Sequence, residues 1–198
     1  MSAMPAPRRT LPAGEPDAEH RRHVVSALVV DRPGTLNRVS GLLRARSFNI
    51  ESLTVGTTHE PGRSRMTIAI RGDDGHLRQV LAQLERLIEV LDVTDLTSAP
   101  HIELELVLVE LEPPRTPSAE QSLRDILSNA GGETLETGDD VWRARLTATP
   151  DTIDQALDAL REHGLRSLVR AGAVAMAAHP ATSPEPTRTP SENGATPT

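Results

Sequence analysis

The stretch Asp31-Arg32-Pro33-Gly34-Thr35-Leu36 decides the fold of this chain, because it joins a predicted strand to a predicted helix. An apolar run over residues 23–30 precedes it, and apolar residues at helical spacing follow it over residues 36–46. Pro33 fixes one backbone angle, and Gly34 permits angles that other residues resist. The stretch therefore predicts a tight turn whose helix begins with N–H groups that lack intrahelical partners.

Such a helix start can bind an anion, and the carboxylate of Asp31 beside it can hold an ammonium group. Together, these two groups would suit a free amino acid, which is a zwitterion. Most strand–Pro–Gly–helix turns bind nothing, so the turn by itself is only a weak indication of a site.

The composition excludes several classes of function. The chain has 198 residues, a net charge of -7, no cysteine, and Phe48 and Trp142 as its aromatic residues. Negative charge and few aromatic residues argue against a nucleic-acid partner. No apolar run approaches the roughly 20 residues of a membrane span. The seven histidines are scattered without metal-ligand spacing. We expect a soluble, cytoplasmic protein with a core of Leu, Val, Ile and Ala.

The first half of the chain predicts the order βαββαβ. Its strands are expected at residues 23–30, 48–55, 64–70 and 90–96, and its helices at 36–46 and 77–91, the second capped by Asp73 or Asp74. This order predicts a ferredoxin-like antiparallel sheet with two helices on one face. Both faces of the first strand are apolar, so we expect a partner to cover part of the other face.

The second half approximates the same order. Residues 102–108 predict a half-exposed strand with Glu103 and Glu105 on its wet face, and Ser118 with Gln121 predicts a capping box. A hairpin over 133–148 and a helix from Thr149 to His163 follow; the last strands are expected at 165–169 and 173–177. The predicted fold class is α+β, with two ferredoxin-like βαββαβ units in tandem. The predicted divisions are a disordered arm (1–22), two domains (23–98 and 99–178) and a disordered tail (179–198).

No catalytic constellation is visible. The pairs Asp73-Asp74 and Asp139-Asp140 lie in predicted turns, where solvated side chains are the simplest interpretation. The remaining candidate is Asn49 with Ile50, at the start of the strand after the first helix. In a symmetric dimer, the turn of one subunit can face Asn49 of the other, whose amide both donates and accepts. A simple strand-start role for Asn49 is modestly favoured on physical grounds alone.

Residues 23–97 resemble an ACT domain, a small amino-acid-sensing module of ferredoxin-like fold. More narrowly, the chain resembles the regulatory (small) subunit of acetolactate synthase. The strings that carry this resemblance are Asp31-Arg32-Pro33-Gly34-Thr35-Leu36-Asn37-Arg38-Val39, Phe48-Asn49-Ile50-Glu51-Ser52-Leu53-Thr54-Val55 and Ser64-Arg65-Met66-Thr67-Ile68. The C-terminal half is a looser match, and the second domain would be the C-terminal domain of such a subunit.

The resemblance implies a noncatalytic subunit that binds the catalytic large subunit, raises its activity and makes it sensitive to valine or a related branched-chain amino acid. It implies no cofactor in this chain, since thiamine diphosphate belongs to the large subunit. It also implies a homodimer through the ACT domains, with the effector at their interface. By position, the effector contacts would be one subunit's Asp31, Gly34, Thr35 and Leu36 with the other subunit's Asn49 and Ile50.

Two alternatives remain open from the residues. A stand-alone ACT sensor would keep the amino-acid pocket and act on another enzyme or a regulator. A small enzyme, such as a hydrolase, could use the same scaffold, because a fold does not determine a function. The lack of convergent catalytic groups makes the enzyme the weakest of the three hypotheses.

Overall fold

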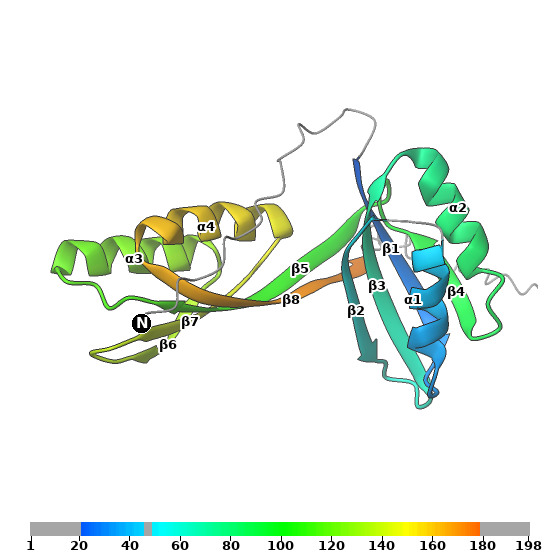
Figure 1. Cartoon of the computed structure of the whole chain (residues 1–198), viewed down its shortest axis with the longest axis horizontal. Helices are drawn as coiled ribbons and strands as arrows, with labels where there is room; N and C mark the ends of the chain where they lie inside the picture. The colour runs from blue at the N-terminus through cyan, green and yellow to red at the C-terminus, as the bar shows by residue number, and fades with distance from the viewer. Residues whose placement is uncertain (1–20, 46–48, 179–198) are drawn as a thin grey trace, which may run out of the picture.

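The computed structural model describes residues 21–45 and 49–178 and contains two four-stranded antiparallel sheets, each with two helices (Figure 1). The predicted tail over 179–198 lies outside the described residues, as does the predicted arm over 1–22 except for its last two residues. The predicted end of the arm is wrong by two residues, because Arg21 and Arg22 begin the first strand and pair with Gly72 and Arg71.

The N-terminal unit has the predicted order βαββαβ. Its elements are β1 (Arg21–Val30), α1 (Thr35–Ala45), β2 (Asn49–Thr57), β3 (Arg63–Gly72), α2 (Asp74–Leu84) and β4 (Val90–Asp95). The strands lie in the order β2-β3-β1-β4 with every pair antiparallel, so the ferredoxin-like prediction is confirmed.

The core of this unit lies between the sheet and the two helices. Alternate side chains of β1 are fully buried there against Val39 and Leu43 of α1 and against the apolar stripe of α2. Asp73 caps α2 by accepting a hydrogen bond from the backbone N–H of His76 at 2.7 Å. The predicted extension of this helix to residue 91 is wrong, because α2 ends at Leu84 and turns lead into β4.

The C-terminal unit repeats the architecture. Its elements are β5 (His101–Leu111), α3 (Pro117–Asn129), β6 (Glu133–Thr137), β7 (Trp142–Ala148), α4 (Pro150–Glu162) and β8 (Leu165–Ala177), in the sheet order β6-β7-β5-β8. Residues 165–177 form one continuous strand instead of the two short strands predicted. Gly172 adopts a φ of 82°, which lets the strand turn locally while it stays paired with β5.

The start of α3 also differs from the prediction. Thr116 is the N-cap, and its hydroxyl accepts from the N–H of Ala119 at 3.2 Å, while Pro117 occupies the first turn. The capping box at Ser118 and Gln121 is therefore wrong by two residues, because proline suits the first helical turn. The predicted start of α4 is confirmed, with Thr149 as its N-cap.

The buried and exposed faces of β5 are the reverse of those predicted. Val107, Val109 and Leu111 are buried against α3 and α4, and Glu105 on the same face is 5% exposed. The even-numbered apolar residues of this strand point away from the helices and are exposed. Glu105 is thus a buried carboxylate, and the wet face predicted for it is wrong.

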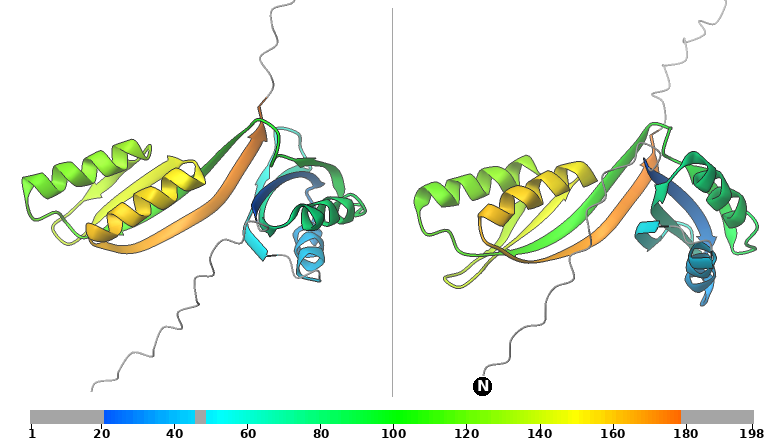
Figure 2. Two further views of the ribbon diagram at one scale, coloured as in Figure 1. Left: turned by 90° about the horizontal axis from the view of Figure 1, so that it is seen from above. Right: turned by 45° about the horizontal axis from the view of Figure 1, so that its top comes forward.

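The two units meet where β5 and β8 extend beyond α3 and α4 as a two-stranded ribbon (Figure 1, Figure 2). Ala175 of β8 packs with Val24 and Leu96 on the face of the N-terminal sheet that the helices leave open. A partner was expected to cover this face, but the chain's own ribbon covers part of it. The second apolar face of β1 is therefore explained within one chain.

Candidate functional site

The turn between β1 and α1 is built as the sequence predicts. Gly34 has a φ of 94°, in the left-handed region that glycine tolerates. The hydroxyl of Thr35 donates to the carbonyl of Val30 at 3.0 Å, and the Thr35 N–H donates to Arg32 at 3.2 Å. Thr35 is 4% exposed, so its side chain fixes the turn and does not face a ligand directly.

The helix start has amides without intrahelical acceptors next to exposed side chains. The first α-helical bond runs from the N–H of Arg38 to the carbonyl of Gly34 at 3.0 Å. The amides of Leu36 and Asn37 precede it and therefore have no intrahelical acceptor. Asp31 is exposed, and the Leu36 side chain is 47% exposed, so both are accessible at this end of the sheet.

A carboxylate that the sequence did not suggest lies against the same helix. Glu89 accepts the N–H of Val30 through its backbone carbonyl at 2.8 Å, and its side chain pairs with Arg38 at 3.0 Å. Its second carboxylate oxygen, Oε2, is buried without a hydrogen-bond partner among the described residues. Only the pairing of β1 with β4 brings Glu89 here, so local sequence patterns carried no signal for it.

Asn49 and Ile50 lie at the other end of the sheet from the turn. Asn49 pairs with Arg71, which pairs with Arg22 at the start of β1. Arg22 is eight residues from Val30, or about 27 Å at the rise of an antiparallel strand. One chain therefore does not bring the two predicted halves of the site together.

The position of β2 makes these two residues accessible to another chain. Within residues 21–45 and 49–178, this strand is an edge of the sheet and pairs with β3 alone. Its outer backbone groups are open for pairing, as on any edge strand. Asn49 is exposed, whereas Ile50 is partly buried against the core of the unit.

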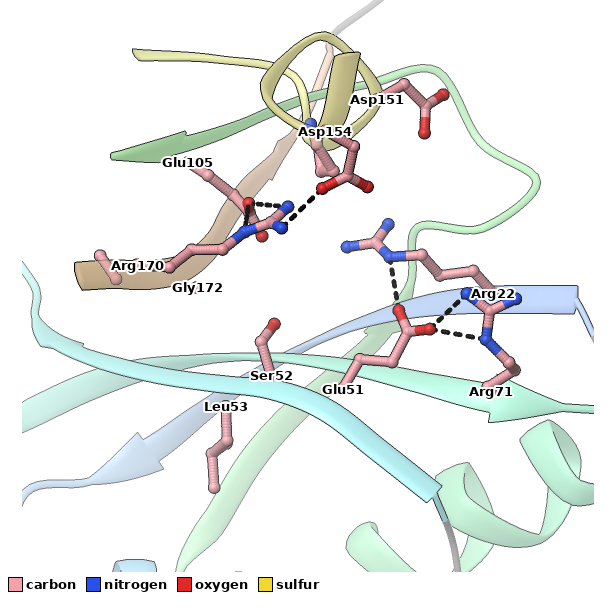
Figure 3. A pocket seen from close by; sticks show the side chains of 12 residues that line it. Arg22, Glu51, Ser52, Leu53, Arg71, Glu105, Asp151, Asp154, Arg170 and Gly172 are labelled. Carbon is pink, nitrogen blue, oxygen red and sulfur yellow. Dashed lines mark hydrogen bonds and ion pairs between the residues drawn. The ribbon is translucent and has the colours of Figure 1, made fainter. Parts of the chain in front are cut away.

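A charged cleft of about 480 Å³ lies between the two units (Figure 3). On the N-terminal side, Glu51 accepts hydrogen bonds from Arg22 at 3.0 Å and from Arg71 at 2.6 Å. Arg22 also reaches across the junction to Glu103 at 2.6 Å. The charges of this wall are thus paired with one another, and Arg22 ties the first strand to the second unit.

The opposite wall of the cleft belongs to the C-terminal unit. Arg170 of β8 binds the buried Glu105 and, at 2.6 Å, Asp154 of α4. Burial opposes the charge of Arg170, but its hydrogen bonds to Asp154 and Glu105 outweigh burial and raise its pKa. The pKa of Arg22 is also raised, chiefly by its hydrogen bond to Glu103. Both guanidinium groups therefore stay charged: Arg22 holds the junction between the two units, and Arg170 ties β5, β8 and α4 together within the C-terminal unit.

The described parts of the chain contain neither a metal cluster nor a membrane helix. No group of three or more His, Cys, Asp or Glu side chains within residues 21–45 and 49–178 is arranged to hold a metal ion. None of the helices in the same ranges has the length and apolar character that crossing a membrane requires.

Comparison with known proteins gives the family. A model of the "AHAS small subunit-like ACT domain" matches residues 25–92, and a model of the "small subunit of acetolactate synthase" matches residues 104–179. The acetolactate synthase small subunit of Aquifex aeolicus is 38% identical over 156 residues, which cover 79% of this chain and 81% of that protein. The chain belongs to the acetolactate synthase small-subunit family. A probable small subunit of Methanothermobacter thermautotrophicus is 39% identical over 162 residues, 82% of this chain and 94% of that one.

A solved structure supports both the fold and the family. The small subunit of acetolactate synthase from Thermotoga maritima matches with a TM-score of 0.72 and 28% identity, over 81% of this chain and 99% of that chain. The two ferredoxin-like units in tandem are therefore the architecture of a small-subunit structure. The N-terminal unit is an ACT domain, as its sequence motifs indicated.

Proposed function

We propose that this chain is the regulatory, noncatalytic subunit of an acetolactate synthase. It binds the catalytic, thiamine-diphosphate-dependent large subunit, raises its activity and confers feedback inhibition by valine or a related branched-chain amino acid. The family supports the large-subunit partner. The observation that supports the regulatory part is that the turn after β1 and Asn49-Ile50 lie at opposite ends of an ACT sheet whose β2 is an edge strand.

The effector site forms between two copies of the chain. Two ACT sheets joined antiparallel through their β2 edges place the turn of one copy beside Asn49 and Ile50 of the other. Backbone N–H groups after Gly34 take the carboxylate, and Asp31 and the Asn49 amide of the second copy take the ammonium. The side chains of Leu36 and Ile50 contact the aliphatic part of the effector.

Regulation follows from the location of this site. An amino acid bound between two copies stabilises one arrangement of the dimer over another. The large subunit responds through a coupling free energy of typically about 1–3 kcal/mol, which corresponds to a 5- to 150-fold change in affinity. No covalent chemistry by this chain is required.

Reconstitution with the large subunit tests the proposal. The full chain is mixed with the large subunit, and acetolactate formation is measured with and without valine. We expect the small subunit to raise the activity and valine to suppress the increase. Absence of any association with the large subunit would refute the proposed partner. Binding of a non-branched amino acid by the isolated chain would favour a stand-alone ACT sensor.

A mixed-dimer experiment tests the shared site. Asp31→Ala and Asn49→Ala should each abolish the valine response while the complex still forms. A mixed dimer of the two variants should recover half of the sites, because one of its two effector sites then carries both changes and the other carries neither. Asp158→Ala, on an exposed side chain of α4, is the control and should respond like the unmodified chain. A full valine response in Asp31→Ala would refute the assignment.

A further inference from the structure

One face of the β5–β8 ribbon is apolar and open to solvent along its whole length. We call this the ribbon face, and its side chains are 38–68% exposed: Ile102, Leu104, Leu106, Leu108, Val169, Val174 and Met176. Register places them together, since Ile102 pairs with Met176, Leu104 with Val174 and Leu108 with Val169. A continuous exposed apolar patch of this kind marks an interaction surface.

The border of the ribbon face is charged, and its charges are already paired. Next to the apolar stripe, Arg143 of β7 binds Glu110 at 2.9 Å and Glu136 at 2.5 Å. Arg145 binds Glu133 at 2.6 Å. The border thus carries both signs of charge, so it neither repels an identical border nor selects a partner of one sign. An apolar centre with a mixed rim is compatible with self-association.

The ribbon contacts the ACT sheet through the free edge of β8. The N–H groups of Ala173 and Ala175 donate to Ser52 of β2 at 3.5 Å and to Thr67 of β3 at 3.3 Å. Thr54 of β2 donates to the carbonyl of Ala171 at 3.4 Å. From the C-terminal end of β8 toward its start, the ribbon therefore crosses β3 first and then leaves the ACT sheet over β2 (Figure 1).

The two faces of the ribbon look toward opposite ends of β2. The face that carries Glu105 and Arg170 borders the charged cleft near Glu51. The ribbon face borders an apolar groove of about 360 Å³, together with Gly56 and Thr57 at the other end of β2. Beyond β2, α3 and α4 cover the face of Glu105. Of the two faces of the ribbon, the ribbon face is therefore the one that the described residues leave open to a neighbour.

The two-fold axis of the proposed effector dimer would also pass close to this ribbon. An antiparallel β2–β2 contact that brings Asn49 of one copy opposite Thr57 of the other has its axis near Leu53. The ribbon leaves the sheet over Ser52 and Thr54, immediately beside that axis. Rotation by 180° places the second ribbon next to the first and reverses the direction of its ribbon face.

We propose that the ribbon faces of two copies pack against each other across the same two-fold axis. The contact is sheet on sheet, with Leu106 near the axis and the two ends of the stripe exchanged between copies. This proposal rests on the proposed function, because it uses the dimer that the effector site requires. It adds a second surface to that dimer and links the C-terminal units of the two copies directly.

Single-cysteine cross-linking of the full chain tests the contact. The chain has no cysteine, so Leu106→Cys introduces a unique thiol on the ribbon face. Packed sheets lie about 10 Å apart, so a short bismaleimide can join two such thiols. The control is Ile88→Cys, an 84% exposed apolar side chain just before β4, at the edge of the ACT sheet opposite β2. We expect cross-linked dimers from Leu106→Cys and few from the control.

A charge on the ribbon face provides a second measurement. Adding Leu104→Lys to the Leu106→Cys chain should suppress cross-linking, because two lysines would then be buried against each other. Leu104 is exposed in the single chain, so this change should leave the fold intact, which circular dichroism checks. Cross-linking of Leu106→Cys no greater than the control would overturn the proposal, as would loss of cross-linking on addition of the large subunit.

Valine binding by the same preparations separates this proposal from the proposed function. Cross-linking without any amino-acid binding supports the ribbon contact and refutes the effector site. Valine binding in a chain that does not cross-link through Leu106 supports the effector site and overturns the ribbon contact. Failure of the ribbon contact can therefore be told apart from failure of the proposed function.

Discussion

Two alanine substitutions in the same segment should change the stability of the ACT domain in opposite directions. Gly34 and Gly41 both face open space, with no atom within 4 Å of an added Cβ. They differ in the backbone, since Gly34 has a φ of 94° and Gly41 lies inside α1. The pair therefore isolates backbone conformation from packing.

The magnitudes follow from that difference. Alanine at Gly34 has to adopt a left-handed conformation, which costs about 1–2 kcal/mol. Alanine at Gly41 removes the glycine penalty inside a helix and stabilises the fold by about 0.5–1 kcal/mol. The two variants should differ in free energy of unfolding by about 2 kcal/mol. With an m-value of about 2 kcal/mol/M, their urea midpoints should differ by about 1 M.

Urea denaturation of the full chain, followed by circular dichroism, measures this difference. The m-values should stay equal, since neither change alters the surface exposed on unfolding. Gly34→Ala should also weaken valine binding, because strain in the turn displaces the amides that take the carboxylate. Equal midpoints for the two variants would show that Gly34 is not held in the left-handed region, and the argument for the turn would fail.

Three further predictions concern the Glu105–Arg170 ion pair, the apolar core and the stability of the fold at acid pH. Glu105→Gln should lower the free energy of unfolding, measured by urea denaturation, by about 1–2 kcal/mol. Breaking a fully buried ion pair costs more, but the Arg170 side chain is 32% exposed and keeps its ion pair with Asp154. Leu43→Ala, at a fully buried position, should cost about 2–5 kcal/mol in the same assay, and a smaller loss would mean that the site collapses around the cavity. The hydrogen bond from the N–H of His76 lowers the pKa of the Asp73 carboxyl. The cap therefore stabilises the fold fully at pH values above the ordinary Asp pKa of about 3.9, and this stabilisation is lost as the pH falls through the lowered pKa. Asp73→Asn should flatten the acid limb of the melting temperature against pH, and an unchanged slope would contradict this.

The sequence by itself determined most of the local structure. Alternating apolar residues, the Pro33-Gly34 turn and the cap at Asp73 carry their physical causes within a few residues, so their elements are confirmed closely. The order of six elements then allows few topologies, because parallel crossovers have one handedness. The same turn chemistry predicted half of an amino-acid site, which stays a prediction together with its second half at Asn49 and Ile50.

The tertiary structure decided what depends on distant pairing. In β5, Leu104 and Leu106 alternate with Glu105, but Val107 and Val109 interrupt that pattern with a second apolar set. Both faces then qualify for burial, and only packing against α3 and α4 selects the odd-numbered face. The buried Glu105 is neutralised by Arg170, 65 residues away, which no local pattern can indicate. The long-range register also separates Asn49 from Gly34 within one chain, and for this reason the proposed effector site requires a second copy.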